Sequence, residues 1–269
     1  MNATEFVRKE IRGPIAVLFI DRPDCRNALS SMVINELTDA LDSVKYNPAI
    51  RAVVLTGTGS AFCAGMDLKE ASSSPRSAEG ERAAVADAQS LADLLMQIHD
   101  HPKPIVAGLN GDALAGGAGL AMACDLVVAA DSARIGYPEV KRGLVAAIVM
   151  HDLIRLVGER RTKFLLLTGE PISASEAERW GLVNRVVPAS ECVDAAIALG
   201  LAMVEAGPIA LTTTKGQIDE AIRRPHDLRG PAAVSAAIRV SDEAAEGMAA
   251  FLEKRRPNWA IGGPKDGES

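Results

Sequence analysis

Two glycine-bearing segments are the parts of this sequence whose residues could do chemistry. One is AFCAGMDL, residues 61–68, and the other is LAGGAG, residues 114–119. Each presents bare backbone N–H groups close to an expected helix start, where four amides lack an intrahelical partner and the helix dipole is positive. Two such loops lying side by side would bind a developing oxyanion. Either loop taken alone would serve equally well for tight packing of a helix against a neighbouring strand.

Other glycine and cysteine motifs do not fit the chain. Gly117 and Gly119 supply the start of a GxGxxG pattern, but Met122 stands where the third glycine of a dinucleotide-binding loop belongs. No GxSxG elbow and no Walker lysine occurs in the sequence. The spacing of the cysteines argues against a metal site or a disulfide framework and favours buried, reduced thiols. The cysteines are Cys25, Cys63, Cys124 and Cys192.

The composition limits the possible partners. The chain has 269 residues, of which 48% are hydrophobic, enough for one substantial core. Its net charge is -6, whereas proteins that bind nucleic acid or anionic membranes usually carry an excess of positive charge. Any anionic ligand must therefore be held by a local cluster of cations. The uncharged stretch at 113–124 is too short to span a bilayer, and the charged N-terminus has no apolar signal region. We expect a cytoplasmic protein with no membrane or nucleic-acid partner.

Strands are expected to alternate with helices through the first part of the chain. Alternating residues on either side of Gly13 and Pro14 predict a hairpin, and Ser30 or Ser31 is expected to begin an amphipathic helix. Apolar runs predict strands at residues 51–57, 103–111 and 125–131. The second glycine-bearing segment would turn from the middle one of these strands into a helix. This alternation predicts an α/β architecture, whose binding sites lie where strand ends meet helix starts.

Two further regions differ in composition. The polar, small-residue segment at 70–82 is expected to be mobile, ahead of a helix from about Glu81 to His99. From about Ala195 onward the chain is mainly alanine-rich helix. Prolines interrupt it at Pro208, Pro225 and Pro231. This tail is too small for a second catalytic domain, so it either covers the core or mediates self-association.

Several ordered stretches carry a family pattern: RPDCRNALS, AFCAGMDLKE, NGDALAGGAGLAMACDLVVAAD, IGYPEVKRGL, LLLTGEPISASEAERWGLVNRVVP and FLEKRRPNW. They cover nearly the whole sequence and resemble the enoyl-CoA hydratase/isomerase, or crotonase, family. The resemblance implies an α/β fold built as a crotonase-like spiral of ββα units. It implies a core at residues 1–200 with the CoA-binding and active sites, and a C-terminal helical trimerisation region at 201–269. It further implies homotrimers, often paired into hexamers, and acyl-CoA thioesters as ligands, with coenzyme A as part of the substrate and no prosthetic group.

The resemblance also implies the catalytic residues. In this family the thioester carbonyl oxygen lies between two backbone N–H groups, which correspond here to Met66 and Gly116. Because the donors are main-chain atoms, methionine can stand at the first position without removing the N–H. Family hydratases use two glutamates as acid and base. The second corresponds to Glu139, whereas the position of the first holds Gly119, the main departure from the family pattern.

For the CoA portion, the resemblance points to the backbone around Arg26 and Ala28, to the first glycine-bearing loop and to the C-terminus. The loop residues are Cys63, Ala64, Gly65, Asp67 and Leu68. Phe251 and Lys254 match a pair that contacts CoA in this family, often from a neighbouring subunit, and Lys254 supplies positive charge for a phosphate-bearing ligand. Simpler interpretations stay open: Asp67 as a helix N-cap, Lys254 as a solvated side chain, and Phe251 as helix packing.

The missing glutamate bears on the reaction. A single carboxylate can shuttle a proton between the α and γ carbons, as a 3-enoyl-CoA to 2-enoyl-CoA isomerase requires, whereas adding water is better served by two. The sequence therefore narrowly favours an isomerase over a hydratase that uses Glu139 alone. An acyl-CoA-binding protein without turnover is the alternative from another class, and a surface ion pair with Lys141 or Arg142 is the structural alternative for Glu139. Residues 146–150 replace the family's Pro-Gly-rich turn with bulkier apolar groups, which leaves the acyl group open.

Overall fold

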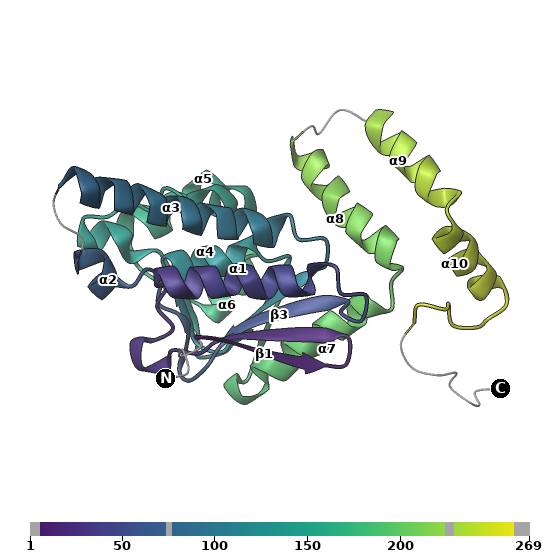
Figure 1. Ribbon diagram of the computed structural model, residues 1–269, viewed down its shortest axis with the longest axis horizontal. Helices are drawn as coiled ribbons and strands as arrows, with labels where there is room; N and C mark the ends of the chain where they lie inside the picture. Colours follow the sequence, from purple (N-terminus) through teal and green to yellow (C-terminus); the bar gives the residue numbers. More distant parts are fainter. Residues whose placement is uncertain (1–5, 74–76, 224–228, 261–269) are drawn as a thin grey trace.

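The computed structural model describes residues 6–73, 77–223 and 229–260, which form two β-sheets with helices packed against them (Figure 1). The predicted hairpin is present, with β1 (Val7–Arg12) antiparallel to β2 (Ile15–Ile20). Gly13 turns the chain between them at φ +60°, a left-handed conformation that glycine adopts without strain.

The larger sheet has the strand order β1-β2-β3-β5-β7-β10, and neighbours from β2 onward run parallel. Its remaining strands are β3 (Ala52–Gly57), β5 (Ile105–Leu109), β7 (Leu126–Ala130) and β10 (Arg185–Val187). Every residue of β2, β3 and β5 is buried. Burial on both faces explains why these segments form continuous apolar runs in the sequence. The three predicted strands are confirmed.

A smaller sheet lies beside the larger one, with the strand order β4-β6-β8-β9. Its strands are short: β4 (Ala61–Cys63), β6 (Asp112–Leu114), β8 (Arg134–Gly136) and β9 (Ile172–Ser173). β4, β6 and β8 run parallel to one another, and β9 is antiparallel to β8. The carboxyl ends of the three parallel strands therefore meet at one edge of this sheet.

Strands of the two sheets follow one another in a repeating order. β3 and β4 lead into helices α2 (Leu68–Ser73) and α3 (Ala78–His99), and β5 and β6 lead into α4 (Gly116–Ala123). β7 and β8 lead into the 3-10 helix η2 (Pro138–Arg142) and then α5 (Met150–Thr168). This repetition is the spiral of ββα units that the resemblance implies. Each short strand consequently ends where a helical segment is about to begin.

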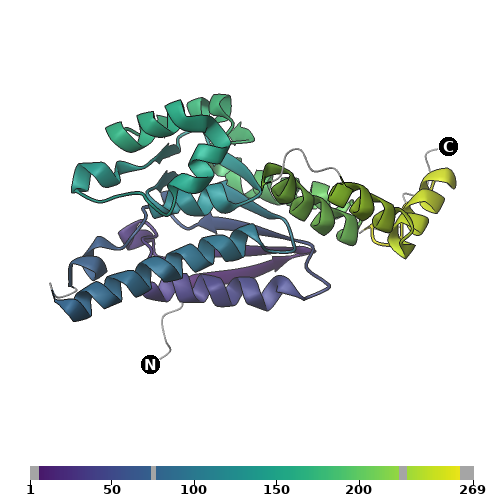
Figure 2. The same cartoon turned by 90° about the horizontal axis from the view of Figure 1, so that it is seen from above.

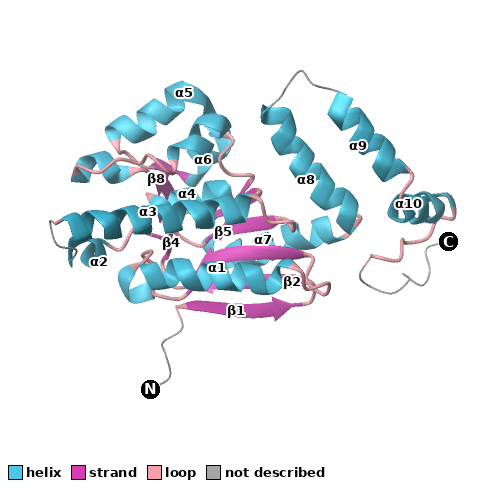
Figure 3. Cartoon of the chain, turned by 45° about the horizontal axis from the view of Figure 1, so that its top comes forward, coloured by secondary structure: helices cyan, strands magenta, loops and turns pink. Residues whose placement is uncertain are grey.

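Further helices close the core. α1 (Ser31–Lys45) is capped by the side chain of Ser30, and α6 (Ala174–Trp180) by that of Ser173. α1 and α3 lie side by side, and α1 packs against β1 and β2 of the larger sheet (Figure 3). α7 (Cys192–Val204) packs against β3, β5 and β7 of that sheet.

After α7 the chain leaves the body of the molecule as a helical arm. The arm consists of α8 (Pro208–Arg223), α9 (Arg229–Arg239) and α10 (Asp242–Leu252), which extend to one side in both Figure 1 and Figure 2. Pro208 opens α8 and Pro231 lies in the first turn of α9, whereas Pro225 lies outside the described residues. Large apolar side chains exposed on the arm are Ile209, Ile218, Ile222, Val240, Met248, Phe251 and Leu252.

Where the structure describes the segment at 70–82, the segment is helical, and the helix expected from about Glu81 begins earlier, at Ala78. Residues 70–73 continue α2 and residues 78–82 open α3, while 74–76 lie outside the described residues. The Ser77 side chain accepts a hydrogen bond from the Gly80 amide and caps α3. The C-terminal half of α3 then buries Leu94, Leu95 and Ile98, which stabilises the helix through its packing.

Within the described residues, no single helix is long and apolar enough to cross a membrane. Residues Ala189–Val204 and Pro208–Ile222 reach that length and composition only together, and a bend of 107° separates them.

Candidate active site

The three loops that carry the predicted catalytic residues meet at one edge of the smaller sheet. Met66 follows β4, Gly116 follows β6 and Glu139 follows β8. β6 lies between β4 and β8, and all three strands run parallel. Gly116 therefore occupies the middle position, with Met66 on one side and Glu139 on the other. Residues more than 70 positions apart in the chain are brought together by this strand order.

The two predicted oxyanion amides lie in adjoining loops. A Cβ atom placed on Gly65 would lie 3.1 Å from the amide nitrogen of Gly116. Met66 forms a parallel bridge with Leu29, in which the Leu29 amide donates to the Gly65 carbonyl at 2.8 Å and the Asp67 amide donates to the Leu29 carbonyl at 2.9 Å. The N–H of Met66 points away from that bridge. Gly116 is the first residue of α4, so its N–H has no intrahelical acceptor.

The loop after β6 is held in a strained conformation. Ala115 has φ 53° and ψ -126°, a region that residues with a side chain rarely adopt. Its amide donates to the Gly136 carbonyl at 2.8 Å, which ties this loop to β8. A Cβ atom on Gly117 would lie only 2.3 Å from the Cys63 carbonyl oxygen, so glycine is required there. The strain and the close approach together fix the direction of the Gly116 amide.

Glu139 supplies the carboxyl group. Its side chain is half-buried, and its Oε2 atom is buried with no hydrogen-bond partner among the described residues. Burial raises the pKa of Glu139 above its ordinary value, while a backbone hydrogen bond of its own and the Arg142 guanidinium act in the opposite direction. The suggested surface ion pair does not form, since Lys141 pairs with Glu170 and Arg142 donates to a backbone carbonyl. A buried acid of raised pKa suits proton transfer.

Met66, Gly116 and Glu139 line one cavity, which has a volume of about 570 Å³. One part of its wall is rich in polar groups and includes Cys25, Arg26, Asp67 and Lys69. Another part is apolar and comes from α3 and the segment before α5. It includes Ala88, Leu91, Leu144, Val145, Ala146, Ile148 and Val149. The cavity can therefore take a ligand that has both a hydrophobic and a charged portion.

The position of the absent glutamate is filled by another residue. Gly119 lies three residues after Gly116 on α4, and hence on the same face of the helix. A Cβ atom on Gly119 would lie 2.3 Å from Cγ1 of Val149 and 3.8 Å from Cδ1 of Leu95. Gly119 and Val149 are buried, and Val149 also lines the cavity. Val149 thus occupies the space into which a side chain at position 119 would project.

The residues predicted to contact CoA fall into two groups. Those that line the cavity are Arg26, Ala28, Ala64, Asp67 and Leu68. Cys63 and Gly65 do not line it; burial raises the pKa of the Cys63 thiol to about 12, and its sulfur accepts from the Gly65 amide at 3.4 Å. Phe251 and Lys254 lie in the helical arm, where Phe251 is 82% exposed. Within this chain, neither arm residue lines the cavity.

Asp67 has the capping role that the sequence left open. Its Oδ1 accepts from the amides of Lys69 at 3.1 Å and Glu70 at 3.3 Å, and its Oδ2 pairs with Arg22 at 3.1 Å. Burial opposes ionisation, but the Glu70 amide, the Arg22 guanidinium and the Lys69 amide outweigh it and lower the pKa of Asp67. The ion pair fixes the loop that presents the Met66 amide.

Comparison with known proteins decides the family. The profile of the family described as Enoyl-CoA hydratase/isomerase matches residues 10–261, which include all three loops of the cavity. The chain belongs to the enoyl-CoA hydratase/isomerase family. Its architecture is the α/β crotonase fold, as the sequence predicts, and the protein is an enzyme of this family.

Relatives in the enoyl-CoA hydratase/isomerase family match along almost their full length. A Thermus thermophilus protein named as an enoyl-CoA hydratase is 42% identical over 252 residues, covering 92% of this chain and 98% of its own. The 2,3-dehydroadipyl-CoA hydratase of Escherichia coli is 32% identical over 252 residues, covering 91% and 94%. The crystal structure of enoyl-CoA hydratase from Bacillus anthracis has a TM-score of 0.87 at 31% identity, covering 95% and 99%.

Some residues of this crotonase site have weak signals or none in the sequence. Asn27 is fully buried, and its side chain donates to the carbonyls of Thr58 and Ala61, which holds the loop around Arg26 against the cavity. An asparagine directly after Arg26, at the end of a mostly polar stretch, gives no local sign of this role. Lys69 and Arg142 add cations to the cavity wall. Both lie within family motifs, but nothing in their spacing singles them out.

Proposed function

We propose that this enzyme hydrates 2-enoyl-CoA thioesters and that Glu139 is the acid and base of the reaction. The observation that carries the proposal is the buried, unpartnered Oε2 of Glu139 in the same cavity as the amides of Met66 and Gly116. The reaction needs both kinds of group. The two N–H donors stabilise the negative charge on the thioester oxygen, and the carboxyl group moves a proton.

The amides act on the thioester carbonyl. Its oxygen accepts hydrogen bonds from the N–H groups of Met66 and Gly116, and both bonds strengthen as negative charge develops on the oxygen. By analogy with acyl-transfer enzymes, each donor lowers the barrier by about 3 kcal/mol. The positive end of the α4 dipole faces the same oxygen and adds to this effect. The withdrawal of electrons makes C3 of the enoyl group electrophilic.

Glu139 then moves one proton twice. The carboxylate takes a proton from the water whose oxygen adds to C3, and the electrons of the C2–C3 double bond shift to form an enolate held by the two amides. Glu139 next returns the proton to C2 as the enolate collapses. One water is consumed, one C–O and one C–H bond form, and the carboxylate is regenerated. A single acid completes the cycle without a second glutamate at position 119.

The choice of hydration over isomerisation reverses the narrow preference drawn from the sequence. The relatives are named for hydration, including the 42% identical Thermus thermophilus protein and the Escherichia coli 2,3-dehydroadipyl-CoA hydratase. Isomerisation of 3-enoyl-CoA is the second candidate function. It is favoured by one observation, the filling of the Gly119 side of the cavity by Val149, because moving a proton from C2 to C4 needs only Glu139.

The absorbance of the conjugated thioester separates these activities. Purified protein is incubated with a 2-enoyl-CoA and, separately, with a 3-enoyl-CoA of the same length. Hydration lowers the absorbance of the first sample, whereas isomerisation raises that of the second. We expect the first change to be the faster one. If CoA thioesters of several chain lengths bind tightly and neither absorbance changes, an acyl-CoA-binding protein without turnover replaces the hydratase.

We further infer that the helical arm assembles the chain into a homotrimer or a hexamer, in which Phe251 and Lys254 reach the CoA of a neighbouring copy. The support is the set of large apolar side chains that the arm of α8, α9 and α10 leaves exposed, a feature typical of a protein–protein interaction site. Light scattering should give three or six times the mass of 28.2 kDa. A monomeric mass would contradict the inference.

A further inference from the structure

Tyr137 is a buried, ionisable residue for which the reaction described above has no role. It lies directly after β8 and two residues before Glu139, and its side chain is 0% exposed. Its hydroxyl oxygen is buried and has no hydrogen-bond partner among the described residues. Buried hydroxyl groups are normally paired with a protein atom or with ordered water, so the burial of this one requires a partner.

Glu139 lacks a partner at one oxygen of its carboxyl group. Its Oε2 is buried and unpartnered in the part of the chain that the structure describes. The carboxyl group does receive a backbone hydrogen bond from Glu139 itself, which leaves Oε2 free to accept another. A hydroxyl donor and a carboxyl acceptor, both without a partner, are therefore buried within one tripeptide, residues 137–139.

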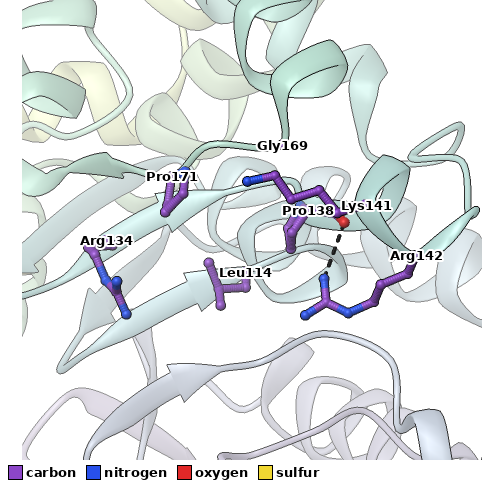
Figure 4. A pocket seen from close by; sticks show the side chains of 7 residues that line it. All are labelled: Leu114, Arg134, Pro138, Lys141, Arg142, Gly169 and Pro171. Atoms are coloured by element: carbon purple, nitrogen blue, oxygen red, sulfur yellow. Dashed lines mark hydrogen bonds between the residues drawn. The ribbon is translucent and has the colours of Figure 1, made fainter.

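The main chain around Glu139 is held firmly. The Leu144 amide donates to the Glu139 carbonyl at 3.0 Å. Figure 4 shows Arg142 donating to the Pro138 carbonyl, at 3.2 Å. These bonds fix the backbone of η2 and leave the carboxyl group of Glu139 to turn about its side-chain torsions. A donor that acts on Oε2 would fix the carboxyl group as well.

The Tyr137 hydroxyl lies behind the cavity wall. Glu139 and Pro138 line the cavity, whereas Tyr137 does not. Burial raises the pKa of the Tyr137 hydroxyl, and the carboxylates of Glu139 and Asp152 act in the same direction. The hydroxyl therefore keeps its proton at neutral pH and serves as a donor. It can affect a bound substrate only through Glu139.

We propose that Tyr137 is a positioning residue for Glu139, and that one buried water molecule connects its hydroxyl to Oε2. The proposal rests on the proposed function, since it takes Glu139 as the acid and base. The hydroxyl donates to the water and the water donates to Oε2, so both buried atoms gain a partner. A carboxylate oxygen has two acceptor sites, so Oε2 can still face the substrate. The bridge holds the carboxyl group in one orientation and favours its ionised form.

The charged groups around Tyr137 and Glu139 come from η2, α5 and the cavity wall. Arg142 of η2 lowers the pKa of Glu139. Asp152 of α5 acts on Tyr137 and itself pairs with Arg155 at 3.3 Å. The other ionisable residues of the cavity wall, within the described ranges, are Cys25, Arg26, Asp67, Lys69, Glu70 and Asp87. All of these groups are retained in Tyr137→Phe, so its difference from the wild type measures the effect of the hydroxyl.

The acid limb of kcat/KM tests the positioning role. In Tyr137→Phe the donor is lost, so the pKa of Glu139 rises and the limb should move to higher pH by about half a pH unit to one pH unit. The plateau value of kcat should fall about threefold to tenfold, because the carboxyl group is less well oriented, while KM changes by less than about twofold. An acid limb that stays in place would overturn the proposal.

Tyr46→Phe is the matched control. The chain has two tyrosines, and the side chain of Tyr46 is 82% exposed at the end of α1. Removing its hydroxyl should leave the acid limb, kcat and KM at their wild-type values. If Tyr46→Phe moved the limb as far as Tyr137→Phe does, the shift would not come from the buried hydroxyl and the proposal would be wrong.

An NMR spectrum of the tyrosines tests the contact without turnover. Protein labelled with a carbon isotope at tyrosine Cζ gives two signals, because the chain has two tyrosines, and Tyr46→Phe assigns them. The Tyr137 signal should shift with pH as Glu139 ionises. This dependence should disappear in Glu139→Gln and persist in Asp152→Asn. The opposite result would give the hydroxyl to Asp152 and overturn the proposal.

The NMR readout also distinguishes this proposal from the hydratase proposal. A protein with no hydratase activity still shows whether Tyr137 senses Glu139, and if the protein isomerises 3-enoyl-CoA instead, the acid limb is read from that reaction. Hydration with an unmoved limb and a Tyr137 signal that ignores Glu139 would remove the positioning role alone. The labelled wild type, Glu139→Gln and Asp152→Asn suffice if Tyr137→Phe does not fold.

Discussion

The active-site region has two walls that differ in their capacity for proton transfer. We call them the Glu139 wall, formed by the segment after β8, and the Gly119 wall, formed by α4 with Val149 and Leu95. On the Glu139 wall a half-buried carboxyl group has an unpartnered oxygen and a raised pKa. On the Gly119 wall there is no side chain, and Cγ1 of Val149 lies 2.3 Å from where a Cβ atom would be. Leu95 closes the same space from α3. One wall carries a group that can bind and release a proton, and the other is apolar.

A second acid at position 119 is excluded by packing as well as by sequence. Interiors are close-packed, so the volume of a glutamate at position 119 is available only if Val149 becomes smaller at the same time. A change at either position alone leaves a clash or a void. The mechanism proposed above accordingly has the water that adds to C3 deprotonated on the Glu139 wall, with a single carboxylate.

The largest expected effect comes from removing the carboxylate. Glu139→Gln should lower turnover by about 10² to 10⁴-fold, the usual contribution of a general acid or base, while CoA-thioester affinity changes little. Initial rates and calorimetric binding check both parts. Unchanged turnover would exclude Glu139 as the base.

The same substitution, Glu139→Gln, should not lower the stability of the fold at neutral pH. The folded-state pKa of Glu139 is raised, so the fold prefers the protonated form, and the stability this provides is lost as pH rises from the ordinary value of 4.5 through the raised value. Glutamine has no ionised form to disfavour. Thermal melting at neutral pH should therefore show Glu139→Gln to be at least as stable as the wild type, and a clear loss would indicate a structural role instead.

The next largest effect tests the apolar wall. Gly119→Ala should destabilise the fold by about 1–3 kcal/mol, because its Cβ meets a packed Val149. Gly216→Ala is the matched control: it also lies in a helix, α8, with no atom within 4 Å of a Cβ. Alanine at position 216 should stabilise by about 0.5–1 kcal/mol. Denaturant unfolding measures both changes.

A double substitution sharpens this result. In Gly119→Ala with Val149→Ala, the second change removes the methyl groups that the first one meets. The combined loss of stability should be smaller than the sum of the two single losses, which a double-mutant cycle measures directly. Strict additivity would mean that the two residues do not share one space.

Much of the larger sheet could be predicted from the sequence. β3, β5 and β7 are continuous apolar runs because both faces of the sheet are covered, and Gly13 with Pro14 marks the hairpin turn. The cap of α1 by Ser30 follows from the type of residue that precedes an amphipathic stretch. In each case the signal is local, so a window of a few residues contains it.

The smaller sheet and the apolar wall could not be predicted in this way. β4, β6 and β8 have three residues each, too few for a periodic pattern, and they exist because they pair across more than 20 positions of chain. The unusual bulk at 146–150 was visible in the sequence, but not the contact of Val149 with Gly119. That contact joins two elements that meet only in the folded chain.

The smallest expected effect concerns the charge next to the carboxylate. The Arg142 guanidinium lowers the pKa of Glu139 against the larger effect of burial, so Arg142→Gln should raise it. Because the reaction begins with ionised Glu139, kcat/KM falls as pH drops through this pKa, and the acid limb of the variant should lie at higher pH than that of the wild type. Each protein is compared with its own plateau. A pantetheine thioester is the substrate, which keeps the phosphate groups out of the measurement.

Arg142→Lys is the matched control, since it retains a positive charge near Glu139 and should keep the acid limb close to that of the wild type. A limb that stays in place in both variants would mean that the group titrating there is not Glu139 or does not sense Arg142. A limb that moves only with Arg142→Gln would assign the ionisation to the carboxylate wall. On the Gly119 wall, by contrast, neither Val149 nor Leu95 has a group that can titrate, so that wall contributes nothing to the acid limb.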